Sequence, residues 1–198
     1  LKTPIQSIQG YIHTLLDGAL EDEKVNELFL IKASNGTKRL IELVDELTDI
    51  NVLQGKNPPL DYEKFDIVKL TEEVFELVEN KAVKQKVSLK FKQQNPKQVI
   101  VNGDIAKIRQ VLINLIVNAI KYGKEDGSVQ VGFFDMDENI LIEVSDDGQG
   151  IGEEHLPRLF ERFYRTDKGR RRDQGGNGLG LAIVKHIVEA HHQIINVR

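Results

Sequence analysis

The sequence predicts an α+β fold: an N-terminal antiparallel helical hairpin, followed by an α/β sandwich with a mixed sheet and helices on one face. Apolar residues recur at steps of three and four over the first 50 residues, a pattern typical of packed helices. After residue 66, helical and strand-like segments alternate. Because some strand-like segments follow one another directly, we expect a mixed sheet rather than a doubly wound parallel one.

Two apolar stripes predict the hairpin. The first consists of Ile5, Ile8, Ile12, Leu15 and Ala19. The second consists of Ala33, Leu40, Leu43, Val44, Leu47 and Ile50. Residues 17–22 between them supply turn and capping types. Since two helices cannot bury stripes of this length by themselves, we expect a homodimer in which two hairpins form a four-helix bundle.

Pro58 and Pro59 end the hairpin, because proline cannot continue a helix and restricts the residue before it. We therefore expect a hairpin over 1–56, a linker over 57–65 and a second domain over 66–198. Helices are expected over 66–84, 104–122 and 179–191. Strands are expected over 87–92, 99–101, 129–134 and 140–144.

Composition excludes several functions. The net charge of −4 is spread along the chain, so no basic surface for nucleic acid is expected. The absence of cysteine excludes disulfides and thiolate metal sites. No run of about 18 apolar residues occurs, so we expect no membrane contact by this segment.

Polar residues form a second face on the predicted helix 104–122. Asn114, Asn118 and then Lys121 or Tyr122 recur at four and three residues, closely flanked by apolar residues. Asparagines on a helix are often merely solvated, but partly buried amides need partners. Their carbonyl oxygens suit Mg²⁺, which is often shared with nucleotide phosphates. Lys121 is placed to neutralise phosphate charge.

Two glycine-rich segments follow. Asp146 emerges at the end of a strand beside Gly148 and Gly150, where a flat ligand could approach and the carboxylate could accept a hydrogen bond from an exocyclic amine such as that of adenine. Taken alone, the segment favours an ordinary Asp-Gly turn. The loop 175–181 leads into the last helix, so its amides could face an anion. Its spacing fits neither the dinucleotide fingerprint nor a P-loop.

The segment 159–165 between the glycine motifs is aromatic and basic. Phe160 and Phe163 could anchor a cover over a ligand, with Arg165 reaching a phosphate. The phenylalanines could instead belong to the core and the arginines to the solvated surface.

In this order, residues 114–122, 146–152, 160–165 and 176–180 resemble the asparagine, first glycine, phenylalanine and second glycine boxes of two-component sensor histidine kinases. Leu1-Lys2-Thr3-Pro4 resembles the end of the family motif His-Glu-Leu-Lys-Thr-Pro. The resemblance implies a dimerisation and phosphotransfer hairpin, and an ATP-binding domain of the kind shared with gyrase and mismatch-repair ATPases.

The resemblance also implies roles for individual residues, with ATP and Mg²⁺ as ligands. Asn118, supported by Asn114, would hold Mg²⁺, while Lys121 and Arg165 would meet phosphates. Asp146 would recognise adenine, and Thr3 would assist attack on or release of the phosphoryl group. The remaining residues expected around the nucleotide are Tyr122, Gly148, Gly150, Ile151, Phe160, Phe163, Gly176, Gly178, Leu179 and Gly180.

The acceptor histidine of the motif would stand just before Leu1, and a final strand would follow residue 198, so we expect a segment trimmed at both ends. We interpret the five histidines that the chain does carry, His13 included, as ordinary rather than as acceptors. By resemblance, the segment is a cytoplasmic domain of an inner-membrane bacterial sensor, and its partner is the receiver domain of a response regulator.

Other functions remain open at this stage. A degenerate kinase would bind ATP and act only by dimerising or docking. A gyrase-like hydrolase would need a water-activating glutamate on the helix 104–122, which carries Gln110 and Asn114 but no glutamate. A purely structural coiled-coil dimer would leave the four boxes unexplained.

Overall fold

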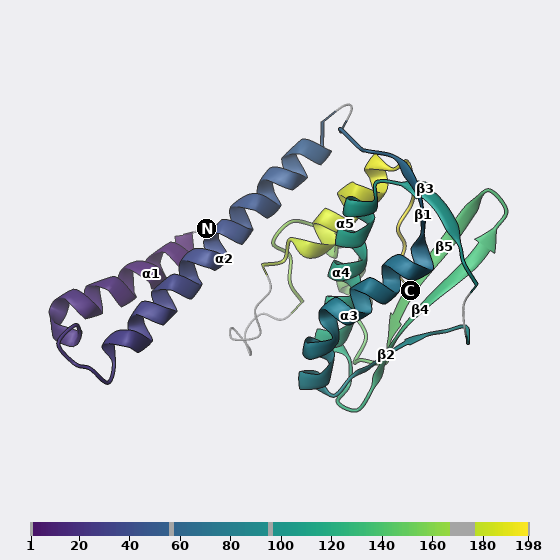
Figure 1. Ribbon diagram of the computed structural model, residues 1–198. Helices are drawn as coiled ribbons and strands as arrows, with labels where there is room; N and C mark the ends of the chain where they lie inside the picture. Colours follow the sequence, from purple (N-terminus) through teal and green to yellow (C-terminus); the bar gives the residue numbers. More distant parts are fainter. Residues whose placement is uncertain (1, 56–57, 95–96, 167–176, 198) are drawn as a thin grey trace. The chain divides into compact units, whose positions relative to one another are not determined.

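The computed structural model describes residues 2–55, 58–94, 97–166 and 177–197, without the side chains of residues 2 and 3 (Figure 1). It divides into two compact units, Leu1–Val52 and Leu53–Arg198. None of the described helices combines the length and the apolar content that crossing a membrane requires.

The first unit is the predicted helical hairpin. Helix α1 (Lys2–Thr14) continues into a π-helical turn, η1 (Leu15–Ala19), and α2 (Asn26–Leu53) runs back along it (Figure 1). Gly18 bends the chain at φ 120°, a conformation that residues with a Cβ rarely adopt. The helices approach closely at Gly36, where a Cβ would lie 2.7 Å from Ile8 Cγ1.

The second unit contains two small sheets. Strands β1 (Glu63–Asp66) and β3 (Ile100–Gly103) pair antiparallel. Strand β4 (Ser128–Met136) lies between β2 (Ser88–Phe91), which runs parallel to it, and β5 (Asn139–Asp146), which runs antiparallel. The mixed sheet predicted from the sequence is thus confirmed.

Helices α3 (Ile67–Gln85), α4 (Ile105–Tyr122) and α5 (Gly180–Ala190) cover one side of this sheet (Figure 1). The core lies between the two layers, where Val74, Ile116, Val129 and Val131 have no exposed surface. Helix α4 packs against both α3 and α5, so its own position is fixed from two sides.

Aspartates begin the first two of these helices, as expected for N-caps. Asp66 accepts a hydrogen bond from the Val68 amide in α3, and Asp104 accepts one from the Lys107 amide in α4. Behind Asp104 lies His191, which sequence analysis treated as ordinary. It is buried, its Nε2 accepts the Asp104 N–H at 3.0 Å, and its Nδ1 lies 2.8 Å from the Ile187 carbonyl oxygen.

Two elements were not expected from the sequence. Strand β1 occupies part of the stretch 57–65 that was assigned to a linker, and its Phe65 packs into the core. The 3-10 helix η2 (Glu153–Arg158) lies in a region that was expected to be loop. Both are too short to produce a clear apolar period, so only their tertiary contacts distinguish them from loops.

Candidate functional site

Helix α4 presents two different faces. Leu112, Ile116 and Ala119 are buried in the core, while Asn114 and Asn118 on another face are only partly buried. Because the apolar face is locked between neighbouring helices, the two amides are held in fixed positions along the helix. We call the face of α4 that carries Asn114 and Asn118 the floor of the candidate site.

The second glycine segment meets this floor at its Asn114 end. A Cβ added to Gly180, the first residue of α5, would lie 3.3 Å from Asn114 Oδ1. No described side chain caps the amino end of α5, and helix amides left in this way attract anions. The arrangement brings an amide oxygen and a positive helix end together, which suits a phosphate group and its counterion.

The first glycine segment meets the floor at its other end. A Cβ at Gly148 would lie 2.9 Å from the Tyr122 carbonyl carbon, and closer still to its oxygen. Glycine is therefore required there for the loop after β5 to pack against the end of α4. Asp146 Oδ1 accepts the Gly148 N–H at 2.9 Å, and the carboxylate is exposed beside the helix end.

The neighbouring aspartate has a different task. Asp147 Oδ2 accepts the Ser128 N–H at 2.9 Å, which ties the loop to the start of β4. From the sequence, a role is expected only for Asp146, as the group that recognises adenine. In the structure both carboxylates are exposed: Asp147 bonds the start of β4, and Asp146 bonds Gly148 within the loop, where it could also meet a ligand.

The predicted residues Lys121 and Tyr122 contact each other. Lys121 Nζ donates to Tyr122 Oη at 3.1 Å and lies 4.7 Å from the centre of its ring. The tyrosine is 40% exposed. The pair combines an aromatic ring and a cation at the end of α4, where the Tyr122 carbonyl packs against Gly148 of the Asp146 loop, and such a combination suits a flat, anionic ligand.

The distance between the Asn114 end and the Tyr122 end of the floor limits the shape of a ligand that can contact both. Asn114 and Tyr122 are eight positions apart on α4, roughly 12 Å at the rise of an α-helix. A compact ligand cannot touch both ends, whereas an elongated one with a flat end and an anionic end can.

The aromatic segment joins the second glycine segment through the backbone. The Phe163 N–H donates to the Gly178 carbonyl at 2.8 Å, and both residues have positive φ, 63° and 70°. A Cβ at Gly178 would lie 2.8 Å from the Phe163 carbonyl carbon. Phe163 remains half exposed and Phe160 is partly buried, so the segment combines the two alternatives that the sequence left open.

The structure describes the remaining predicted residues in less detail. Gly176 lies outside the described residues, as does the side chain of Thr3, whose backbone belongs to α1. Ile151 and Arg165 are exposed, Leu179 is buried at the start of α5, and Gly150 has a φ of 73° with open space around it.

Charged groups around η2 were missed by the sequence analysis. Arg158 makes a two-pronged ion pair with Glu161, with Nη2 to Oε2 at 2.9 Å, and its guanidinium lies over the Tyr164 ring. The hydrogen bond from Arg158 lowers the pKa of Glu161, and the same bond raises the pKa of Arg158. Both groups therefore stay charged near neutral pH.

A polar cluster joins the aromatic segment to α5. Gln54 Oε1 accepts from Arg162 Nη2, and its Nε2 lies 3.2 Å from His186 Nε2. Burial lowers the pKa of His186, despite the opposing pull of Glu189, and the positive charges of Arg162 and Lys185 lower it further. The lowered pKa favours the neutral form of His186, in which Nε2 can accept from Gln54 Nε2.

In the described part of the site, the candidate metal ligands are the side-chain oxygens of two asparagines. Within the described ranges, no group of three or more His, Cys, Asp or Glu side chains could hold a metal ion. The amide oxygens of Asn114 and Asn118 alone fit Mg²⁺ only if the ion is also bound by phosphates, a combination that Mg²⁺ commonly accepts.

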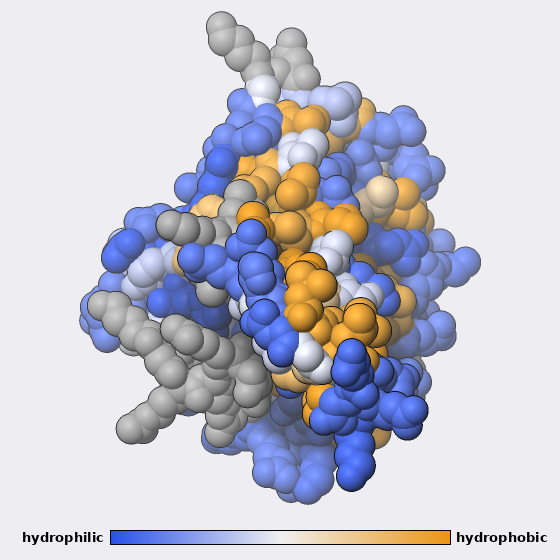
Figure 2. Space-filling view, turned by 90° about the vertical axis from the view of Figure 1, so that its left-hand side faces the viewer, coloured by the Kyte–Doolittle hydropathy of each residue, from blue (hydrophilic) through white to orange (hydrophobic). Residues whose placement is uncertain are grey.

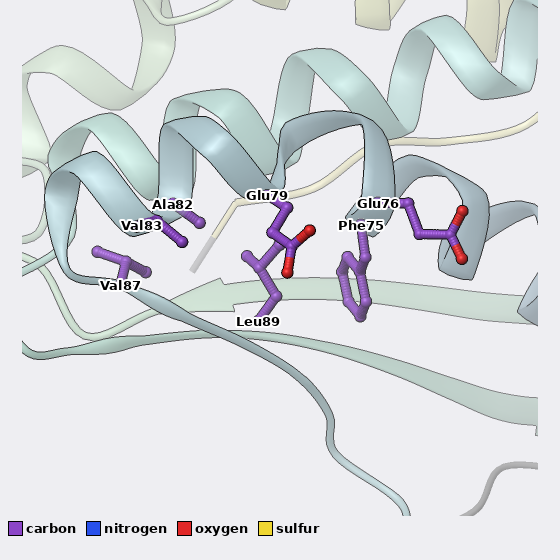
Figure 3. Close-up of a pocket in the computed structure, with 7 residues that line it drawn as sticks. All are labelled: Phe75, Glu76, Glu79, Ala82, Val83, Val87 and Leu89. Atoms are coloured by element: carbon purple, nitrogen blue, oxygen red, sulfur yellow. The ribbon is translucent and has the colours of Figure 1, made fainter.

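A separate hollow lies between α3 and β2 (Figure 3). It has a volume of about 330 Å³ and is lined by Phe75, Glu76, Glu79, Ala82, Val83, Val87 and Leu89. None of the predicted site residues contributes to it.

Comparison with known proteins now decides the family. Residues 103–198 match the model described as "Histidine kinase-, DNA gyrase B-, and HSP90-like ATPase". The sensor histidine kinase WalK of Bacillus subtilis is 35% identical over 194 residues, which cover 96% of this chain and 31% of WalK. The catalytic domain of histidine kinase ThkA is 32% identical, with 65% of this chain and 80% of that one covered at a TM-score of 0.57.

This chain belongs to the sensor histidine kinases. Its fold agrees with that of Acinetobacter baumannii histidine kinase AdeS, with a TM-score of 0.77 at 29% identity over 96% of this chain and 85% of that one. The matched structures include ThkA in complex with the response regulator TrrA, with a TM-score of 0.74 at 28% identity over 97% and 52% of the two chains. They also include ShkA in complex with AMPPNP, with a TM-score of 0.70 at 27% identity over 83% and 33%.

The histidine kinase chain described here spans about a third of the length of its Bacillus subtilis relative. The resemblance drawn from the four boxes is confirmed as to family. The roles of individual residues stay predictions.

Proposed function

We propose that this chain is the catalytic portion of a sensor histidine kinase, which binds Mg-ATP and transfers the γ-phosphate to a histidine and onward to an aspartate of a response regulator. The observation that carries the proposal is the convergence on α4 of the two glycine segments, one at Tyr122 and the other at Asn114. The family supports the same reaction, and its relative ShkA was solved with an ATP analogue.

The geometry suggests how the nucleotide lies. Adenine would sit at the Asp146 end, where the carboxylate can accept a hydrogen bond from the exocyclic amine and Tyr122 offers an aromatic surface. The phosphates would extend along α4 towards Gly178 and Gly180. There the uncapped amides of α5 would donate to phosphate oxygens.

Catalysis would rest on positioning and on charge neutralisation, since phosphoryl transfer needs little covalent help from the protein. Mg²⁺, when bound, supplies positive charge next to the phosphates. Asn114 and Asn118 would hold it through their amide oxygens, Lys121 and Arg165 would meet phosphate oxygens, and Thr3 would assist transfer at the acceptor histidine, which is expected just before Leu1.

The hairpin supports assembly into a homodimer. Many of its large apolar side chains are exposed, namely Ile5, Ile12, Leu16, Leu20, Leu28, Leu30, Ile31, Ile41 and Val44. Apolar residues, orange in Figure 2, are also visible at the surface among hydrophilic ones, which are blue. Burial of such surface against a second copy is what a four-helix bundle would provide.

We further propose that the chain is a cytoplasmic domain of an inner-membrane bacterial sensor, and that its phosphorylated hairpin is recognised by a receiver domain. The complex of the relative ThkA with its response regulator supports the second point.

The nucleotide site can be tested by calorimetric titration with a non-hydrolysable ATP analogue and Mg²⁺. Asp146→Asn should weaken binding at least tenfold, because the hydrogen bond from the adenine amine to a charged acceptor is lost. Asp147→Asn is the matched control, since Asp147 bonds the Ser128 amide, and it should change stability more than affinity. Equal affinity in wild type and Asp146→Asn would contradict the adenine assignment.

Transfer needs a chain that includes the residues before Leu1. Incubation of that chain with γ-labelled ATP should give an acid-labile label on histidine. Tight binding without any label would instead favour a degenerate, purely regulatory nucleotide-binding protein.

A further inference from the structure

The short helix η2 and the aromatic segment are joined by a hydrogen bond that none of the predicted roles uses. His155 Nδ1, on η2, lies 2.7 Å from the hydroxyl of Tyr164, and the two rings are 6.1 Å apart. Both side chains are partly buried. The Arg158 guanidinium lies 4.4 Å from the Tyr164 ring centre, so η2 holds this tyrosine by two side chains.

The tyrosine follows directly after a residue in an uncommon conformation. Phe163 has a φ of 63°, a value that residues other than glycine, asparagine and aspartate seldom adopt and that costs free energy. Such a conformation persists only where its surroundings over-determine it. On one side of it the Phe163 N–H bonds Gly178, and on the other side Tyr164 is held by its N–H bond to the Glu161 carbonyl and by its side-chain contacts with His155 and Arg158.

Gly178 is equally committed to this arrangement. Its own φ is 70°, and any Cβ there would press against the Phe163 backbone. The conformation of Phe163 therefore determines where the second glycine segment can lie. That segment leads directly into the uncapped amino end of α5, where the proposed site expects phosphates.

We propose that His155 is a positioning residue for the nucleotide site. Through the Tyr164 hydroxyl it holds Phe163 in its left-handed conformation, and Phe163 in turn holds Gly178 at the phosphate end. His155 itself does not touch the nucleotide. This inference rests on the proposed function, because the nucleotide is the ligand of that function. The hydrogen bonds among His155, Tyr164, Phe163 and Gly178 do not depend on it.

The first measurement is made without nucleotide. Amide hydrogen exchange at Phe163 reports the bond to Gly178 directly, because a protected N–H exchanges only when the bond opens. Tyr164→Phe keeps the ring under Arg158 and removes the hydroxyl, and His155→Leu removes the partner. Each should accelerate exchange at Phe163 by about threefold to tenfold, the range expected for loss of one hydrogen bond.

The second measurement is the affinity for the Mg-ATP analogue. Both variants should weaken it by a similar factor, and the double variant should be no worse than either single one, because the two residues act as a unit. His155→Gln, whose amide can still bond the hydroxyl, should restore most of the affinity. His13→Leu, an exposed histidine of the hairpin, is the control and should change nothing.

Each result decides the inference. Faster exchange together with weaker binding and rescue by His155→Gln supports it. Unchanged exchange in Tyr164→Phe overturns it, and so does faster exchange with unchanged affinity. If the wild type binds no nucleotide, the proposed function is wrong and so is the positioning role. The exchange result shows separately whether the His155–Tyr164 bond holds Phe163.

Discussion

At the scale of single residues, the site depends most on glycines that allow close approach. Gly148→Ala would force the loop after β5 away from the Tyr122 carbonyl, because the new Cβ has no room. We expect nucleotide affinity to fall at least tenfold, as Asp146 moves with the loop. Titration with the ATP analogue checks this.

Gly150 provides the control within the same loop. A Cβ there meets nothing within 4 Å, so Gly150→Ala introduces only the strain of a positive φ, about 1–3 kcal/mol. It should reduce affinity less than Gly148→Ala does. If both variants bind like the wild type, the contact between the loop and α4 does not shape the site.

Protonation of His186 should make the stability of the folded protein depend on pH. Its folded pKa is lowered, by burial first and by Arg162 and Lys185 next, whereas in the unfolded chain it titrates near the ordinary value of about 6.5. As pH falls through that value, the unfolded chain takes up a proton that the folded one does not. Acidification therefore favours unfolding until the folded pKa is also passed.

Denaturant unfolding at pH 7.5 and 5.5 tests this expectation. The loss of stability on acidification should be smaller in His186→Gln than in the wild type, whereas His13→Gln should lose as much as the wild type. The same loss in His186→Gln as in the wild type would show that His186 does not titrate as its surroundings imply.

At the scale of elements, α4 supports the core and the candidate site with the same turns. Ile116 is fully buried on the face opposite the amides. Ile116→Ala should cost about 2–5 kcal/mol of stability and Ile116→Val only about 0.5–1.5 kcal/mol, because the residual cavity differs. Urea unfolding measures both. Leu77→Ala on α3, whose side chain is 64% exposed, should be close to neutral.

Long helices can be predicted from the sequence, whereas the short elements cannot. Long amphipathic helices such as α3 and α4 have enough turns to display their period, and Asp66 and Asp104 mark their starts. The four residues of β1 and the six of η2 display no period, and they are stable only through contacts with distant residues such as Ile100 and Tyr164.

In the candidate site, too, some features can be predicted from the sequence and others cannot. The residue types of Asn114, Asp146 and Gly180 predict their chemistry, because amides, carboxylates and glycines are each limited in the partners that they suit. The hydrogen bond of Asp147 to Ser128 spans 19 residues and that of His155 to Tyr164 spans nine, and each depends on how the loops between them fold. No local pattern encodes those partners.

At the scale of the whole molecule, the exposed apolar face of the hairpin has consequences for assembly. Ile12 is 46% exposed on α1 and belongs to the predicted stripe. If two hairpins form a four-helix bundle, Ile12→Glu would bury a carboxylate among apolar side chains, which is strongly unfavourable. We expect the wild type to be a dimer of the 22.5 kDa chain and this variant to shift towards monomer.

Sedimentation equilibrium over a range of concentrations measures this shift. Leu77→Glu is the matched control, since it adds the same charge at an exposed apolar position of the second unit and should leave the dimer intact. The ATP analogue should bind Ile12→Glu as tightly as wild type, because every described residue expected to contact the nucleotide lies in the second unit. A wild type that stays monomeric at all concentrations would contradict dimerisation through the hairpin.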